Sequence, residues 1–109
     1  MFGFRKLDVY QCAVRALPLA YRLAERADAE TKRQLKRAAL SINLNIAEGT
    51  GRCDADQRQF YRIARGSALE SAAVLDALQA LELVTREEIL PLEELLVRIV
   101  AMLTKMSAG

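Results

Sequence analysis

The sequence predicts an all-α protein, an antiparallel up-down-up-down four-helix bundle formed by a single domain of residues 1–109. Composition supports this prediction, because 52% of the residues are hydrophobic and only five glycines and two prolines interrupt the chain. No run of alternating β-branched residues, the pattern typical of strands, occurs anywhere. A chain of 109 residues also has the length that suits one hydrophobic core.

Four similar patterns mark the predicted helix starts. In each, an Asp or Thr stands three residues before a Gln or Glu, so that side chains can satisfy backbone N–H groups that are free at a helix start. A helically periodic stretch follows each pattern, which predicts helices near residues 6–26, 29–48, 54–82 and 86–107. Because the connections are short, successive helices must fold back on one another. The four patterns are Asp8 with Gln11, Thr31 with Gln34, Asp54 with Gln57, and Thr85 with Glu88.

Two of the predicted helices contain a proline. Pro18 falls inside the first helix, and Pro91 falls inside the first turns of the fourth. Proline removes one N–H and crowds the carbonyl four residues earlier, so we expect a kink at each position. An alternative for the fourth helix is a later start near Leu90, with residues 85–89 forming a separate turn.

The third and fourth predicted helices carry more apolar surface than one bundle core needs. Residues 68–81 are apolar over more than half of the helix circumference, and the fourth helix has two neighbouring apolar stripes. A bundle buries roughly three positions in seven of each helix, so the excess predicts self-association through these two helices. The alternative is a wide, alanine-rich core within one subunit. The candidate interface residues are Leu96, Val100 and Leu103.

Positive charge is concentrated in the first part of the chain. Residues 1–65 hold 13 Lys and Arg against 7 Asp and Glu, a balance of +6, whereas residues 66–109 hold 3 against 7, a balance of −4. On the third helix, Arg58, Arg62 and Arg65 recur about once per turn and form what we call the arginine row. Such a row can meet successive phosphates of a nucleic acid.

A second basic cluster opens the second helix and includes Arg33, Lys36 and Arg37. Because the second and third helices are antiparallel, the arginine row and this cluster should lie toward opposite ends of the pair. The alternative for both is a solvated helix face that is paired with acids. Arginine is the stronger signal for phosphate, since its guanidinium fork binds phosphate through two hydrogen bonds.

The sequence gives little support to enzymatic or metal chemistry. It has no histidine, and Cys12 and Cys53 lack metal-ligand spacing. The segment GTGR at 49–52 has neither the Lys-Ser/Thr pair nor the preceding strand of a P-loop. We therefore expect no enzyme activity, no cofactor and no metal. Free thiols indicate a reducing compartment, and no signal peptide or membrane-spanning run is present, so the expected location is the cytoplasm.

Three segments of the chain resemble one known family. They are LDVYQCA at 7–13, QLKRAALSINLNIAEGTGR at 34–52 and FYRIARGSALES at 60–71. Together they closely resemble the 23S rRNA intervening-sequence proteins, and the resemblance extends over nearly the whole chain. That family is related in turn to the accessory variability determinant of diversity-generating retroelements. Pro18 and Pro91 are not part of the family pattern.

The resemblance implies a bundle without enzymatic activity that assembles into a ring, commonly a homopentamer. The retroelement relatives bind nucleic acid and a reverse transcriptase through a basic surface. We therefore expect a homo-oligomer that binds RNA or DNA, with a reverse transcriptase as a further partner by analogy. The alternative is a structural scaffold or protein-interaction module with no nucleic-acid partner. The candidate phosphate-binding residues are Arg58, Arg62, Arg65, Arg33, Lys36, Arg37 and Arg52.

The segment SINLNIAEGTGR at 41–52 is unusually polar for a helix that contributes to a core. Its residues Ser41, Asn45 and Glu48 fall on one line beside the apolar stripe, where the second helix meets the third. We expect an interhelical polar network that joins them to Ser67, Glu70 or Arg62 and sets the register of the pair. Gly49 is expected to close the helix in the left-handed conformation. The alternative is a cleft in which Glu48, Arg52 and the arginine row bind an RNA phosphate or a small anion.

Overall fold

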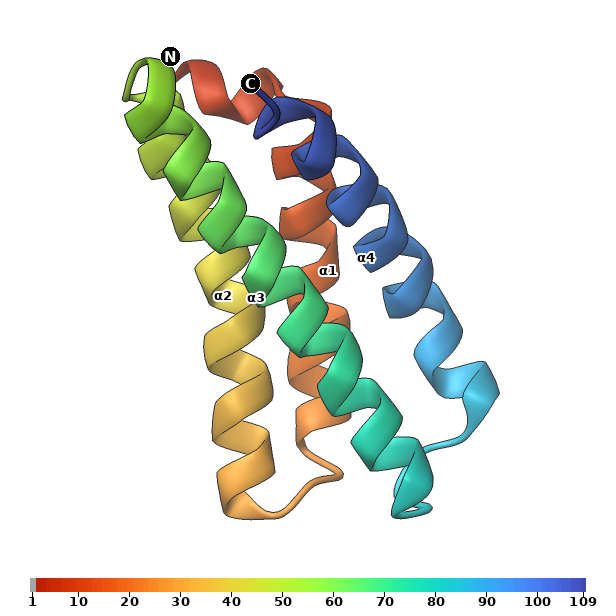
Figure 1. Ribbon diagram of the computed structural model, residues 1–109. Coiled ribbons are helices and arrows are strands. Elements are labelled where there is room, and N and C mark those ends of the chain that lie inside the picture. Colours follow the sequence, from red (N-terminus) through yellow and green to blue (C-terminus); the bar gives the residue numbers. More distant parts are fainter. Residues whose placement is uncertain (1) are drawn as a thin grey trace.

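The computed structural model describes residues 2–109 as four long helices joined by short turns (Figure 1). A short 3-10 helix, η1 (Gly3–Lys6), precedes them. Figure 1 shows each long helix running opposite to the one before it, so the predicted up-down-up-down bundle is confirmed. The four helices are α1 (Asp8–Ala24), α2 (Ala29–Thr50), α3 (Asp54–Ala80) and α4 (Arg86–Met106).

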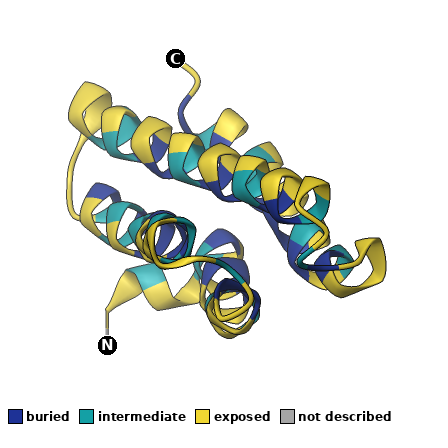
Figure 2. Ribbon diagram, turned by 90° about the horizontal axis from the view of Figure 1, so that it is seen from below, coloured by how far each residue is buried: buried dark blue, intermediate teal, exposed yellow. Residues whose placement is uncertain are grey.

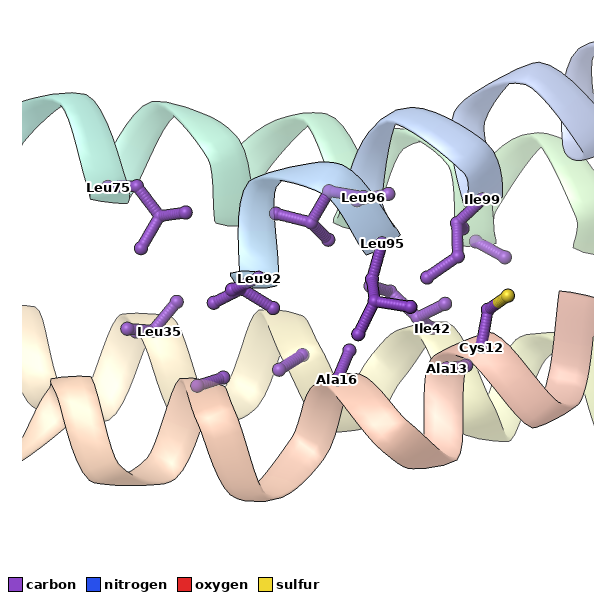
Figure 3. Close-up of a cluster of buried hydrophobic side chains, with 14 of the residues drawn as sticks. Cys12, Ala13, Ala16, Leu35, Ile42, Leu75, Leu92, Leu95, Leu96 and Ile99 are labelled. Carbon is purple, nitrogen blue, oxygen red and sulfur yellow. The ribbon is translucent and has the colours of Figure 1, made fainter. Parts of the chain in front are cut away.

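The core lies along the axis between the four helices. α1 and α3 each pack against both α2 and α4, whereas α1 and α3 lie diagonally opposite each other. Figure 2 shows the buried positions turned toward this axis and the exposed positions turned outward. In Figure 3, Cys12 and Ala16 of α1, Leu35 of α2, Leu75 of α3 and Ile99 of α4 point into one shared cluster. One apolar face of every helix is thereby removed from water.

Only the last of the four predicted capping boxes forms within residues 2–109. The Thr85 hydroxyl accepts from the backbone N–H of Glu88 at 3.2 Å, and the Glu88 carboxylate accepts from the Thr85 N–H at 2.9 Å. The other three predictions are wrong, because a capping side chain must belong to the residue just before the helix. Asp8 and Asp54 are already the first helical residues, and Thr31 lies inside the first turn of α2. Leu7, Asp28 and Cys53 occupy the cap positions, and none makes a side-chain capping bond.

Neither proline ends its helix. α1 continues through Pro18, and α4 continues through Pro91. α4 begins at Arg86, directly after the Thr85 cap, so the alternative of a later start near Leu90 is wrong. Both prolines are exposed, and the carbonyl groups that lose a helical donor on that side of the bundle can turn to water.

Gly49 does not adopt the predicted left-handed conformation. α2 continues through Gly49 to Thr50, and Gly109 is the only glycine among residues 2–109 with a positive φ. Gly49 is instead buried, and it faces the ring of Tyr61 on α3. The missing side chain therefore serves the close approach of α2 and α3 rather than the end of the helix.

Candidate nucleic-acid interface

The arginine row lies along the first half of α3, at the end of the bundle where α4 finishes (Figure 1). Arg62 donates from Nη2 to the carbonyl oxygen of Ser107 at 3.1 Å, and Arg65 donates from Nε to Oγ1 of Thr104 at 2.8 Å. The last carbonyl groups of a helix lack partners within the helix, and positive charge is favourable there. The row therefore ties the end of α4 to α3.

Arg58 packs more closely than its neighbours in the row. Its Nε is buried and has no hydrogen-bond partner in the described part of the chain. A Cβ placed on Gly109 would lie 3.0 Å from both Cδ and Nε of Arg58, so the stem of this side chain lies against the C-terminal residue. The row thus has one guanidinium group held mainly by packing and two held by hydrogen bonds.

None of the three arginines in the row forms an ion pair with a carboxylate of residues 2–109. The groups that accept from Arg62 and Arg65 are neutral, so they leave the charges uncompensated. Each guanidinium also has five N–H donors, of which one hydrogen bond uses only one. The row consequently keeps positive charge and free donors, which are the two properties that a phosphate needs.

The second basic cluster is arranged differently, because an acid lies beside each of its candidate residues. Arg33 pairs with Glu30 at 2.8 Å, and this hydrogen bond raises the pKa of Arg33. The Glu25 carboxylate accepts a hydrogen bond from Lys32 and lies 3.3 Å from Nζ of Lys36. Both lysines lower the pKa of the Glu25 carboxyl, and Lys32 has the larger effect. Arg37 pairs with Glu70 of α3 at 3.2 Å. The structure therefore agrees with the alternative interpretation of this cluster, which was a solvated helix face paired with acids.

Arg52 is also paired with acids. Its Nη2 lies 2.7 Å from Glu48 and its Nη1 lies 3.2 Å from Asp56. The hydrogen bond to Glu48, followed by the charge of Asp56, raises the pKa of Arg52. The structure therefore does not bring Arg52, Arg33, Lys36 or Arg37 together with the arginine row as one free basic patch.

Three further cations at the same end of the bundle were not singled out from the sequence. Arg5 and Lys6 lie in η1, and Lys105 lies in the last turn of α4. Figure 1 shows η1, the start of α3 and the end of α4 at one end of the molecule. None of the three forms an ion pair within residues 2–109. They were missed because they lie far from the arginine row in sequence. The up-down-up-down order nevertheless places both termini at the same end of the bundle as the start of the third helix.

Part of the polar segment links α2 to α3. The hydroxyl of Ser67 donates to the hydroxyl oxygen of Ser41 at 2.9 Å, and Nδ2 of Asn45 donates to the same oxygen at 2.9 Å. Glu48 and Glu70 lie outside this group, because each pairs with an arginine at the surface. We call Ser41, Asn45 and Ser67 the serine–asparagine link.

Three further polar residues of the helix pair, Thr50, Tyr61 and Asn43, were not assigned to the network by the sequence analysis. The hydroxyl groups of Thr50 and Tyr61 lie 3.3 Å apart and add a second polar contact between α2 and α3. Asn43 is 5% exposed, and its Oδ1 has no hydrogen-bond partner in the described part of the chain. Its neighbour Leu44 is 60% exposed. The polar Asn43 is therefore buried while the apolar Leu44 faces water, the reverse of what their hydrophobicity predicts.

The arrangement of the polar segment and the arginine row is accompanied by a family match over most of the chain. A model of the family described as 23S rRNA-intervening sequence protein matches residues 5–105, from η1 into the last turn of α4. The chain belongs to the 23S rRNA-intervening sequence protein family. A search of curated proteins found no significant match.

In this intervening-sequence protein, an apolar groove lies between α3 and α4. It has a volume of about 340 Å³, and Leu69 and Val97 line it with 46% and 64% of their surfaces exposed. Of the predicted interface residues, Leu96 and Val100 also line the groove. Leu103 does not, because it is 0% exposed and belongs to the core of one subunit. Leu96 is 2% exposed and likewise packs mainly inward, as Figure 3 shows.

The remaining expectations concern membranes and metals. None of the helices in residues 2–109 of this intervening-sequence protein combines the length and the low polarity that crossing a membrane requires. Within the same residues, no three side chains of the metal-binding types gather in one place. Cys12 is buried and Cys53 is exposed, and both are free thiols.

Proposed function

We propose that this protein is a non-enzymatic, ring-forming bundle that binds the phosphates of RNA or DNA through the arginine row. The observation that carries the proposal is that Arg58, Arg62 and Arg65 stand together without a carboxylate partner in residues 2–109, whereas the other candidate cations are ion-paired. Membership in a family described by 23S rRNA favours RNA as the partner. Arg5, Lys6 and Lys105 extend the positive end of the bundle.

The assembly proposed with this function is a homopentamer, as the family resemblance implies. The apolar groove between α3 and α4 supports self-association, because Leu69 and Val97 expose a large part of their apolar surface there. The row lies on α3 as well, so a ring built through these helices repeats the arginines around its circumference. A ring of this kind presents many phosphate contacts at once, which strengthens binding through multivalency.

Two further parts of the proposal concern partner and place. A reverse transcriptase is proposed as a second partner by analogy with the retroelement relatives. A cytoplasmic location is supported by the two free thiols, which persist in a reducing compartment.

A second candidate function is a structural scaffold that binds no nucleic acid. It is favoured by the hydrogen bonds of Arg62 to Ser107 and of Arg65 to Thr104, because these contacts give the arginine row a structural role within the fold. In that case the row stabilises the end of α4, and the groove between α3 and α4 is the functional surface.

Binding of a labelled RNA over a series of salt concentrations tests the first candidate. The triple variant R58Q/R62Q/R65Q should weaken binding and reduce the slope of log K against log salt by about 2–3, since each lost phosphate contact removes about 0.7–0.9. The matched control is R33Q/K36Q/R37Q, which removes the same charge from the acid-paired cluster and should leave the slope nearly unchanged. R62K/R65K retains the positive charge and should preserve RNA binding. Lost binding in R58Q/R62Q/R65Q together with retained binding in R62K/R65K would therefore report lost phosphate contacts.

Two results would overturn the nucleic-acid proposal. One is wild-type protein that binds neither RNA nor DNA at low salt. The other is an equal loss in the row variant and in the control variant, which would show attraction by net charge alone. Either result would leave the scaffold as the better account of the row.

A further inference from the structure

A second arginine-rich surface lies on a different side of the bundle, between α1 and α4. It is a groove with a volume of about 450 Å³, within the size range of small-molecule sites. α1 and α4 pack directly against each other along it. Its lining consists of Arg15, Pro18, Leu19 and Arg22 from α1 and of Pro91, Glu94, Leu95 and Arg98 from α4.

The groove holds more positive than negative charge. Three guanidinium groups line it against the single carboxylate of Glu94, which leaves a net charge of +2. Arg15, Arg22 and Arg98 are exposed, and none of them forms an ion pair with Glu94 or with any other acid of residues 2–109. Three like charges around one groove repel one another, so an anion placed among them is favoured.

The next arginine in the sequence, just after α1 ends, is neutralised by an acid of α4. Arg26 lies in the turn after α1, four residues beyond Arg22, and its Nη1 is 2.7 Å from the Glu88 carboxylate of α4. Leu19 and Arg22 line both the main groove and the smaller cavity that contains this pair. The Arg26–Glu88 ion pair thus lies at one end of the groove. The three arginines without an acid partner lie next to it along the groove.

The two prolines form part of the groove wall. Pro18 and Pro91, which the sequence analysis placed outside the expected family pattern, both lie on this one surface. Their rings are compact and cannot swing, so they leave the space between the longer arginine side chains unfilled. The carbonyl oxygen of Pro18 also accepts from Nε of Arg22 at 3.2 Å, which holds that side chain while its terminal N–H groups stay available.

We infer that the groove between α1 and α4 binds a small molecule that carries two or more phosphate groups. Arginine forks bind phosphate oxygens in pairs, and three of them around one groove match a ligand with several anionic oxygens. A net charge of +2 calls for more than one negative charge. Leu19 and Leu95 supply apolar contact for the part of the ligand that is not phosphate. The arginine row, which lies on α3, takes no part in this site.

Calorimetric titration of the purified full chain with inorganic pyrophosphate, and separately with adenosine diphosphate, tests the inference. The variant R15Q/R98Q should weaken binding of both probes by about tenfold or more, because each arginine loses charge-assisted hydrogen bonds. The matched control is R33Q/R86Q, which removes two arginines that already have acid partners outside the groove. It should change the affinity by less than about twofold.

A gain of affinity gives a test that misfolding cannot mimic. E94Q removes the only carboxylate of the groove and should tighten pyrophosphate binding by about two- to fivefold. Tighter binding of adenosine diphosphate than of pyrophosphate would support an organic phosphate that uses Leu19 and Leu95. Equal binding of the two would support the phosphate groups as the whole of the recognised ligand.

Several outcomes would overturn the inference. They are absence of binding with both probes, equal weakening in R15Q/R98Q and R33Q/R86Q, and an E94Q variant that binds no more tightly than wild type. Loss of RNA binding in R15Q/R98Q without any pyrophosphate binding would assign the groove to the nucleic-acid surface instead. Pyrophosphate binding that persists in R58Q/R62Q/R65Q would show that this site stands independently of the proposed function.

Discussion

Gly49 of α2 and Tyr61 of α3 approach so closely that a Cβ on Gly49 would lie 2.8 Å from Cε1 of the Tyr61 ring. Tyr61 has little freedom to move away, since it is 5% exposed and its hydroxyl lies 3.3 Å from Oγ1 of Thr50. Two segments that carry the family resemblance therefore meet at a contact that only glycine permits.

The substitution Gly49→Ala should destabilise the bundle. The added methyl group must displace a buried ring, and overpacking of this kind costs about 1–3 kcal/mol. The higher helix propensity of alanine offsets up to about 1 kcal/mol of that cost. Thermal unfolding followed by circular dichroism should show a lower Tm.

Gly66→Ala is the matched control for this substitution. Gly66 also lies inside a helix, but a Cβ there meets nothing within 4 Å. Alanine should therefore raise the Tm, because it gains up to about 1 kcal/mol of helix propensity without a clash. A G49A variant as stable as G66A would contradict the steric account.

The serine–asparagine link should couple Ser41 and Ser67 energetically. Their hydroxyl groups are 2.9 Å apart across the interface between α2 and α3. A double-mutant cycle with S41A, S67A and the double variant, measured by urea unfolding, should give a coupling free energy of about 0.5–1.5 kcal/mol. Purely additive effects would show that the contact adds nothing to the register of the helix pair.

Assembly through the apolar groove should be sensitive to charge at Val97. The substitution Val97→Asp would bury an unpaired carboxylate in the proposed subunit interface, which is strongly unfavourable. Light scattering coupled to size exclusion should then report a smaller mass, while circular dichroism stays helical. Leu81→Asp is the control, because Leu81 is 61% exposed but lies outside the groove. An unchanged mass for V97D would rule this groove out as the interface.

The bundle should lose stability in acid in part through Glu88. The backbone N–H of Thr85, followed by the side chain of Arg26, lowers the pKa of the Glu88 carboxyl below its usual 4.5. A carboxyl with a lowered folded-state pKa stabilises the fold above the unfolded-state value, and this stability is lost as the pH falls through the folded-state pKa. E88Q should therefore have a lower Tm than wild type at neutral pH, and the difference should shrink below about pH 4.

Glu87→Gln is the control for the acid prediction. Glu87 occupies the same first turn of α4 but forms no ion pair within residues 2–109. Both substitutions weaken the favourable interaction of a carboxylate with the helix N-terminus. A pH-dependent difference between E88Q and E87Q would thus report the capping box and the Arg26 pair, and equal behaviour would contradict their role.

The order and type of the elements could be predicted because they depend on local patterns. Apolar residues that recur every three to four positions require a helix, and short connections require each helix to turn back. Thr85 with Glu88 formed its capping box as predicted. Asp8, Thr31 and Asp54 show the limit of such patterns, since a difference of one residue in the helix start removes a side chain from the cap position.

The sequence by itself thus determined four amphipathic helices, their antiparallel order and the family, because these follow from spacing along one chain. Only the tertiary structure decided which side chains meet across helices. It paired Arg37 with Glu70 but left Arg62 without an acid, and it buried Leu103 while leaving Val97 exposed. The physical reason is that the rotation of each helix about its own axis is set by the packing of all four helices together, which no single segment encodes.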